Sequence, residues 1–140
     1  MARIVLDTNI LVSAIIASGY SANILDRVRS GELTLITSSH LLEEFSDVIA
    51  RPRITRKYPQ VAERADDLVD FLRAFTELVQ GTPGESQISR DRDDDFVLAC
   101  AVEGSADYII SGDPHLLDLK THRNITILTP REFVEQVLEK

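Results

Sequence analysis

The sequence predicts one α/β domain, in which a central parallel β-sheet of four to five strands is flanked by helices on both faces. Three observations support this prediction. Short β-type runs alternate along the chain with segments of helical periodicity, which is the order typical of parallel sheets. The 140 residues suit a single domain with a sizeable core. No linker, repeat or low-complexity tract divides the chain, so the domain is expected to cover residues 1–140.

The first quarter of the chain alternates between strand and helix signals. Residues 3–6 form a β-type run, and an apolar segment covers residues 10–16. Residues 21–29 have the spacing of a helix that ends near Gly31. Residues 33–37 then form a second strand, so a helical segment connects two strands as a parallel sheet requires.

Two amphipathic helices are predicted in the middle of the chain. Ser38 and Ser39 are suitable N-caps for the first, whose apolar stripe continues until Pro52 ends the helix. Residues 61–79 have the clearest helical spacing of the whole sequence. A polar loop is expected over residues 81–92, where glycine and proline gather.

The last third of the chain returns to the strand and helix alternation. The apolar run at residues 96–102 is compatible with a strand, but its Ala-Cys-Ala content and acidic lead-in favour a helix buried nearly all round. Strands are predicted at residues 107–111 and 125–128. Pro130 begins a final helix that reaches about Leu138.

Composition excludes several classes of site and partner. With one Cys and three scattered His, the chain lacks an internal disulfide and the ligand spacing of a Cys- or His-rich zinc site. No apolar run approaches the ~18 residues of a membrane span, and no secretory signal pattern opens the chain, so we expect no membrane and a cytoplasmic protein. The net charge is −8, so binding a polyanion would need a local basic surface or bound cations.

Two acids follow predicted strands directly. Asp7 comes after the first strand, and Asp113 comes shortly after the third. Because ligands of open parallel sheets bind beyond the carboxyl ends of the strands, these two carboxylates are expected to meet at one edge. The alternative for each is that it caps the helix that follows it.

Further acids can reach the same edge from helices. Glu44 lies at the border of the apolar stripe of its helix, although a solvated position is the usual one for Glu. Four aspartates precede or open the buried helix, more than its dipole needs: Asp91, Asp93, Asp94 and Asp95. A divalent cation would relieve their repulsion. Gathered carboxylates indicate Mg²⁺ or Mn²⁺ and metal-assisted hydrolysis of a phosphodiester.

The same segments resemble, in order, the motifs of PIN-domain ribonucleases. They are residues 4–11 (IVLDTNIL), 42–45 with 48–52 (LEEF and VIARP), 91–95 with 98–101 (DRDDD and LACA), and 106–113 with 116–117 (ADYIISGD and LL). Each motif alone is loose, whereas four in order are specific and span nearly the whole chain. The resemblance is closest to VapC-like toxin components of toxin–antitoxin pairs.

The resemblance implies a parallel sheet between helices and an endoribonuclease that uses Mg²⁺ or Mn²⁺. The catalytic and metal-binding acids of the family fall on Asp7, Glu44, Asp95 or Asp94, and Asp113. The separation from the last acid fits Asp95 best and Asp94 nearly as well. Three positions match residues that support the family's site by hydrogen bonding: Thr8, Asn9 and Ser111. The implied partners are an RNA substrate, a cognate antitoxin and a second copy of the chain.

One departure from the family's pattern keeps another function open. Where many relatives have a further Asp, this chain has Pro114 and His115. Together with the acidic charge, this supports an alternative in which a PIN-like module binds RNA or protein and cuts weakly or not at all. A phosphatase that uses Asp7 as nucleophile is disfavoured, because Asn9 stands where the second acid would be.

One basic stretch offers contacts to nucleic acid. Its members are Arg51, Arg53, Arg56 and Lys57. They are suited to RNA phosphates, and a solvated helix end is an equally good interpretation.

Overall fold

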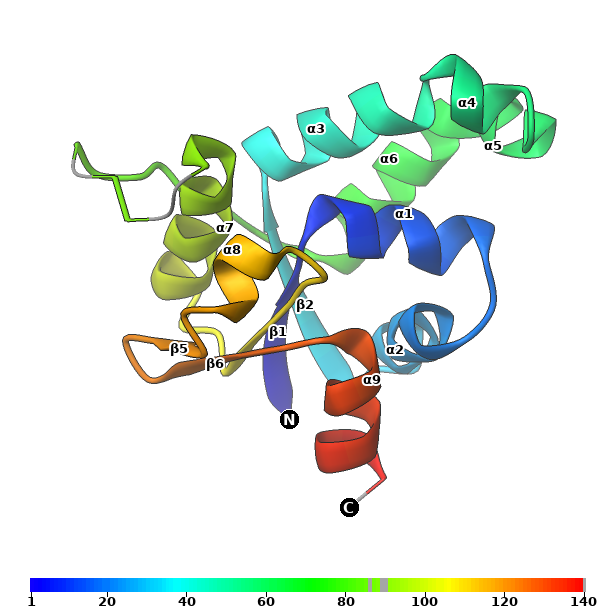
Figure 1. Ribbon diagram of the computed structural model, residues 1–140. Coiled ribbons are helices and arrows are strands. Elements are labelled where there is room, and N and C mark those ends of the chain that lie inside the picture. The colour runs from blue at the N-terminus through cyan, green and yellow to red at the C-terminus, as the bar shows by residue number, and fades with distance from the viewer. Residues whose placement is uncertain (86, 89–90, 140) are drawn as a thin grey trace.

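A single six-stranded sheet forms the centre of the part of the chain that the computed structural model describes, residues 1–85, 87–88 and 91–139 (Figure 1). The strand order is β3-β2-β1-β4-β6-β5. The strands are β1 (Ala2–Leu6), β2 (Leu33–Ser38), β3 (Glu77–Val79), β4 (Tyr108–Ile110), β5 (Thr121–His122) and β6 (Ile125–Leu128). All pairings are parallel except that of β5 with β6. The predicted α/β class is confirmed, with short edge strands β3 and β5 that the sequence analysis did not find.

The helices lie on both faces of this sheet (Figure 1). They are α1 (Thr8–Ile16), α2 (Tyr20–Arg29), α3 (Ser39–Ile49), α4 (Pro52–Thr55), α5 (Pro59–Glu63), α6 (Ala65–Phe75), α7 (Arg92–Glu103), α8 (Pro114–Leu117) and α9 (Pro130–Phe133). A π-helical turn over Val134–Leu138 continues α9. Among the described residues, no single helix is long and apolar enough to cross a membrane, and α1 with α2 reach that length and composition only as a pair bent by 90°.

The central strand β1 separates two hydrophobic cores. Because successive side chains of a strand point to opposite faces, Ile4 and Leu6 pack on one side and Val5 packs on the other. The first core contains buried residues of α1, α2, α3, α6 and α9. The second contains those of α7 and α8. β1 therefore ends between two packed layers.

The prediction of one helix over residues 61–79 is wrong. The segment divides at Arg64 into α5 and α6, and α6 ends at Phe75. The Thr76 hydroxyl donates a hydrogen bond to the Leu72 carbonyl, and residues 77–79 pair in parallel with the end of β2. The apolar spacing typical of the helix continues through residues 77–79. Pairing with the free edge of the sheet nevertheless makes these residues a strand.

The buried helix predicted at residues 96–102 is confirmed as the main part of α7. The helices predicted at residues 21–29 and from Ser39 to the turn before Pro52 are also present, as α2 and α3. The predicted loop over residues 81–92 lies partly outside the described residues, because it includes 86, 89 and 90.

Candidate active site

Asp7 and Asp113 lie at the carboxyl edge of the sheet, after the neighbouring strands β1 and β4. Asp7 is only 8% exposed. The buried Ser111 hydroxyl donates a hydrogen bond of 2.7 Å to Asp7 Oδ2 and accepts one of 2.9 Å from the Asp113 backbone N–H. Ser111 therefore fixes the Asp7 carboxylate relative to the start of α8.

Capping explains some of these acids and not others. Asp7 occupies the N-cap position of α1, but its side chain makes no capping hydrogen bond. Asp113 Oδ1 does cap α8, since it accepts the His115 backbone N–H at 2.8 Å. Asp91 caps α7 by accepting the Asp93 N–H at 3.0 Å. The buried Asp7 carboxylate needs an explanation other than capping.

Asp95 lies on the first turn of α7, and its carboxylate contacts a nearby backbone amide and an arginine. It is 1% exposed. Its Oδ2 accepts the Ile88 backbone N–H at 3.0 Å and lies 3.2 Å from Arg92 Nη1. The Asp95 carboxylate is thus already paired with a guanidinium and a backbone amide.

Asp94, the preceding residue, is also buried but faces Asp113 and His115. Its Oδ2 lies 4.0 Å from His115 Nδ1, which in turn lies 3.7 Å from Asp113 Oδ1. These three residues can each place one ligand atom within 4.8 Å of the others. Asp94 also interacts electrostatically with Asp7. Of the two aspartates that the spacing left open, Asp94 is the one brought to the other acids.

Glu44 approaches the same acids from α3. Its side chain is 33% exposed, and the charges that act on it are those of Asp93, Asp7 and His40. The Thr8 hydroxyl is close enough to the Glu44 carboxylate to lower its pKa, against the raising effect of burial. That hydroxyl is buried and makes no hydrogen bond of ordinary geometry. A polar atom of this kind, beside a carboxylate, is suited to a site that takes a further ligand.

The acids raise one another's pKa values. Burial raises the pKa of Asp7, and the charge of Asp113 adds to the effect while the Ser111 hydrogen bond opposes it. Burial also raises the pKa of Glu44. For Asp94, burial and then the hydrogen bond and charge interaction with Asp113 raise the pKa to about 7. Facing carboxyl groups with raised pKa values are typical of functional sites.

The residues present fit a divalent cation. Carboxylate oxygens from two strand ends and two helices, with the Thr8 hydroxyl nearby, are the donors that Mg²⁺ and Mn²⁺ prefer. His115 adds an imidazole that the sequence analysis noted only as a departure from the family's pattern. The sequence places His115 two residues after Asp113, but its approach to Asp94 depends on α7.

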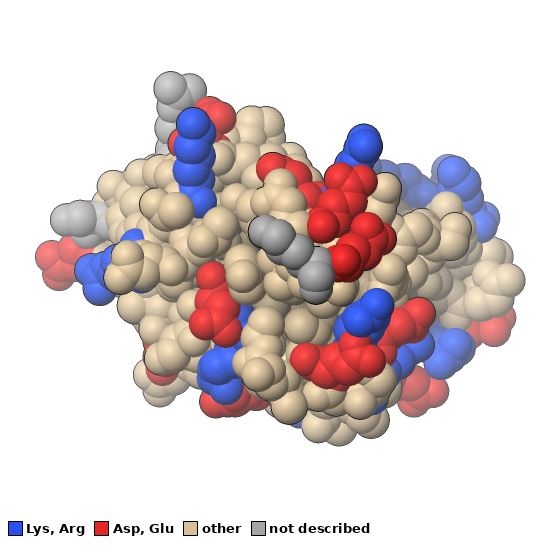
Figure 2. Space-filling model, turned by 90° about the horizontal axis from the view of Figure 1, so that it is seen from below, with Lys and Arg blue, Asp and Glu red and all other residues tan. Residues whose placement is uncertain are grey.

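The other predicted site residues lie at the surface. Asn9 is exposed, and so is the basic stretch Arg51, Arg53, Arg56 and Lys57. α4, which carries Arg53, lies at the far end of α3 from α7 and α8 (Figure 1). Seen from below, acidic and basic side chains both occur across the surface (Figure 2). Among the described residues the buried acids are Asp7, which follows β1, and Asp94 and Asp95, which open α7.

Comparisons with known proteins agree on the fold. The model of the PIN-domain family matches residues 3–115. VapBC2 from Rickettsia felis, bound to a promoter DNA fragment, is similar with a TM-score of 0.58 and 18% identity over 89% of this chain and 96% of that chain. FitAcB from Neisseria gonorrhoeae gives 0.60 and 16% over 91% and 98%. FitAB bound to an IR36 DNA fragment gives 0.60 and 16% over 91% and 94%. No curated protein matches the chain significantly.

Proposed function

The chain belongs to the PIN-domain family, and from that premise we propose that it is a divalent-metal-dependent endoribonuclease and the toxin of a toxin–antitoxin pair. One observation carries the proposal. Carboxyl groups from four separate segments face one another at the carboxyl edge of the sheet, and burial has raised the pKa of three of them. We assign the metal-binding acids as Asp7, Glu44, Asp94 and Asp113.

Asp94 rather than Asp95 is assigned as the third metal-binding acid, because the two carboxylates have different partners. Asp95 is held by Arg92 and the Ile88 N–H, whereas Asp94 lies toward Asp113. A carboxylate that already has a guanidinium partner is a poorer ligand for a cation, since binding would cost that ion pair.

The residues of the chain have distinct tasks in the proposed hydrolysis. Asp7, Asp94, Asp113 and Glu44 would hold the cation. Ser111 orients Asp7 through its hydroxyl. When bound, Mg²⁺ or Mn²⁺ supplies positive charge for the phosphate and a water of lowered pKa for attack on phosphorus. By analogy with the family, the products carry a 5′-phosphate and a 3′-hydroxyl.

Partners follow by analogy with the complexes that share the fold. VapBC2 and FitAB were solved bound to DNA fragments. From the resemblance to VapC-like toxins we infer a cognate antitoxin and a homodimer for this chain. RNA is the proposed substrate, contacted through the exposed stretch from Arg51 to Lys57. The proposed compartment is the cytoplasm, where such a substrate and antitoxin are made. Light scattering of the purified protein tests the dimer.

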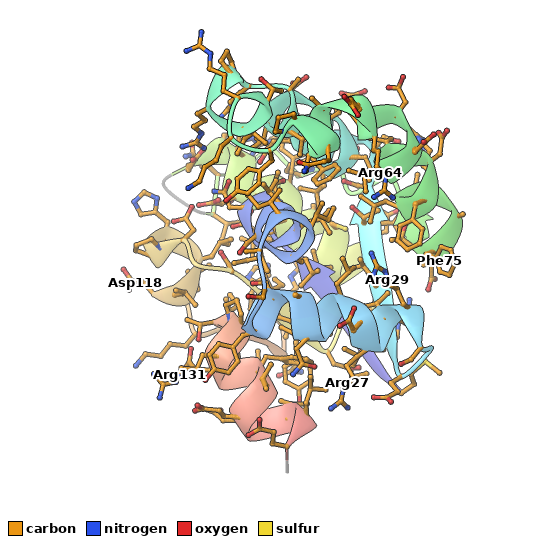
Figure 3. The ribbon with its side chains drawn as sticks, turned by 90° about the vertical axis from the view of Figure 1, so that its right-hand side faces the viewer. Arg27, Arg29, Arg64, Phe75, Asp118 and Arg131 are labelled. Atoms are coloured by element: carbon orange, nitrogen blue, oxygen red, sulfur yellow. The ribbon has the colours of Figure 1, made fainter. Side chains whose placement is uncertain are left out.

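The nuclease proposal is tested with metal-free protein and a labelled RNA. We expect cleavage only after Mn²⁺ or Mg²⁺ is added, and loss of cleavage in Asp7→Asn. The matched control is Asp118→Asn, which removes the same charge from an exposed position after α8 (Figure 3). If neither metal produces cleavage and Asp7→Asn behaves like the parent protein, the nuclease proposal is wrong.

A second candidate function rests on His115, which stands where many relatives have an acid. In that case the chain binds RNA or a protein without cutting. This module predicts no RNA cleavage and no rise in melting temperature with Mg²⁺, and a clear Mg²⁺-induced rise would count against it. Cleavage that depends on Asp7 would exclude it.

A further inference from the structure

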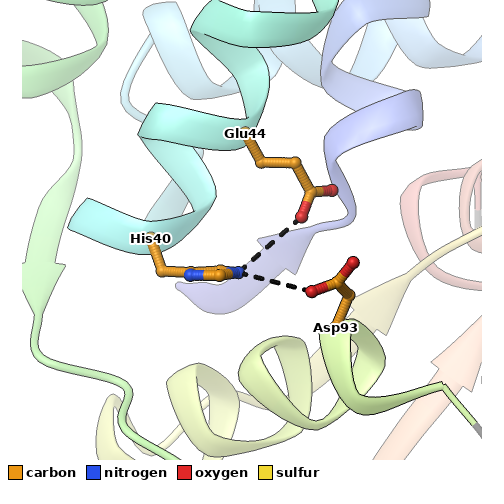
Figure 4. A group of neighbouring side chains, drawn as sticks. All are labelled: His40, Glu44 and Asp93. Carbon is orange, nitrogen blue, oxygen red and sulfur yellow. Dashed lines mark ion pairs between the residues drawn. The ribbon is translucent and has the colours of Figure 1, made fainter.

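His40, Glu44 and Asp93 form a second cluster of metal-ligating side chains, beside the proposed centre (Figure 4). His40 and Glu44 lie one turn apart on α3, and Asp93 lies on the first turn of α7. His40 Nε2 is 3.8 Å from Glu44 Oε2 and 3.9 Å from Asp93 Oδ1. Figure 4 shows the nitrogen directed toward both carboxylates.

The imidazole of His40 packs against an aromatic ring of α7. Its ring stacks on Phe96 of α7, with 3.6 Å between the ring centroids and 8° between the planes. His40 Nε2 is buried and has no hydrogen-bond partner among the described residues. The distances to the two carboxylates exceed the roughly 3.2 Å limit of an N–H···O hydrogen bond. A buried nitrogen directed at two oxygens, but too far from each to bond directly, leaves room for an atom between them.

The spacing agrees with shared coordination. A cation bonded tetrahedrally at roughly 2.0–2.2 Å to nitrogen and carboxylate oxygen separates its ligand atoms by about 3.3–3.6 Å. The two distances of 3.8 and 3.9 Å are slightly longer, so small side-chain movements toward a bound ion would complete the coordination. One ligand atom from each residue lies within 4.8 Å of the others, so the three can face a common point.

A second observation points to a ligand at the same place. Thr8 is 2% exposed, its hydroxyl has no hydrogen-bond partner of ordinary geometry, and it lies beside the Glu44 carboxylate. Two buried polar atoms from different elements, Thr8 Oγ1 and His40 Nε2, thus make no hydrogen bond of ordinary geometry with the described residues, and both lie near the Glu44 carboxylate. Such atoms are rare in folded proteins unless a water or an ion satisfies them.

We propose that His40, Glu44 and Asp93 bind a divalent transition-metal ion at a site adjacent to the Asp7–Asp94–Asp113 centre. One imidazole nitrogen and two carboxylate oxygens suit Zn²⁺, Mn²⁺ or Fe²⁺ better than Mg²⁺ or Ca²⁺, which take oxygen ligands. Two carboxylates also balance the charge of the ion. Asp93 and Asp94 point about 100° apart as consecutive helical residues, so each serves a different cluster. The site shares Glu44 with the proposed nuclease centre, but ion binding at His40 and Asp93 is measured without any readout of RNA cleavage.

The site is tested with Zn²⁺ as the probe and nitrogen NMR of the imidazole rings. The full chain carries Asp7→Asn and Asp113→Asn, so that ion binding at the neighbouring centre is weakened. The chain has three His, and single variants assign their signals. We expect one equivalent of Zn²⁺ to shift the His40 Nε2 resonance while His122 stays unchanged, and Mg²⁺ at the same concentration to shift neither.

Affinity measurements by calorimetry in the same background supply the second readout. Asp93→Asn changes an exposed side chain, so the variant is expected to fold, and it should weaken Zn²⁺ binding at least tenfold. His40→Gln should do the same. The matched control is Asp47→Asn, which removes an exposed acid from the rim of the same hollow on α3 and should leave the affinity unchanged.

Several results would overturn the site. A His40 signal that does not move with Zn²⁺, a shift confined to His115, or an unchanged affinity in Asp93→Asn would each mean that His40 forms an ion pair only. None of these readouts depends on RNA cleavage. A failure here therefore leaves the nuclease proposal standing, and a protein without nuclease activity can still satisfy this test.

Discussion

Two buried aspartates that follow one another on α7 lie in opposite surroundings. Asp95 has a guanidinium and a backbone N–H within hydrogen-bonding distance, so the fold itself compensates its charge. Asp94 faces further carboxyl groups, and its pKa is raised to about 7. The first arrangement is typical of a structural ion pair, and the second is typical of a ligand site. A buried acid is informative about function only when its partners are known.

The largest expected difference between Asp94 and Asp95 is in the rate of RNA cleavage after each is replaced by Asn. Asp94→Asn removes a proposed metal ligand and is expected to lower RNA cleavage by roughly a hundredfold, the size typical of losing one stabilising group at a reaction centre. Asp95→Asn should stay within a few-fold of the parent protein. Single-turnover cleavage with saturating Mn²⁺ measures both. The assignment of Asp94 fails if Asp95→Asn is the inactive variant.

For the free energy of unfolding we expect the opposite order, with the larger loss from replacing Asp95. Asp95→Asn loses charge-assisted hydrogen bonds from Ile88 and Arg92, and is expected to cost about 2 kcal/mol of unfolding free energy. Arg92→Ala should cost less, because Arg92 is 43% exposed and water already screens the pair. Urea denaturation without metal gives both values. Equal or smaller losses from Asp95→Asn would remove the structural interpretation of Asp95.

The pH dependence of metal-free stability sharpens the comparison. Asp94 has a pKa of about 7 in the folded state against 3.8 ordinarily, so the folded state holds a proton that the unfolded state releases. Stability should therefore fall as pH rises from about 4 to 7, by on the order of 1 kcal/mol after allowance for the coupled neighbours. Asp94→Asn should flatten this slope. Urea midpoints measured with a chelator test the expectation, and an unchanged slope in the variant contradicts it.

The smallest expected effect is on RNA binding by exposed arginine side chains, because water already solvates their charges. In the inactive Asp7→Asn background, Arg53→Ala or Arg56→Ala should weaken RNA binding about two- to threefold and reduce the salt dependence by roughly one phosphate contact. Arg131→Ala is the matched control, since Arg131 pairs with Glu135 on the C-terminal turn (Figure 3). If Arg131→Ala weakens binding equally, the stretch from Arg51 to Lys57 is no RNA surface.

The fold and two of the acids were accessible from sequence because they depend on local pattern. Strand periodicity and turn residues located β1 and β4, and the rule for parallel sheets then placed Asp7 and Asp113 at one edge. β3 was missed because residues 77–79 continue the helical spacing of the preceding segment. Only the partner strand β2, some forty residues earlier, decides their conformation.

The third acid and the histidines were not accessible for a different reason. Asp94 and Asp95 both border the buried side of α7, so spacing alone does not distinguish them. The direction of each carboxylate depends on groups from other elements, namely Arg92 with Ile88 for Asp95 and Asp113 for Asp94. His40 lies at i,i+4 spacing to Glu44 on α3, which the sequence shows, but its approach to Asp93, like that of His115 to Asp94, joins different helices and has no local spacing signal.

The position of the acids between two packed layers couples those layers. Glu44 belongs to α3, whose Phe45 and Ile49 pack in the first core, and Asp94 belongs to α7, whose Val97 and Leu98 pack in the second. A ligand held by both helices is lost when either layer opens. Its binding free energy would therefore be added to the cost of every partial unfolding event on both sides of the sheet, and backbone amides in both cores would exchange with solvent more slowly together.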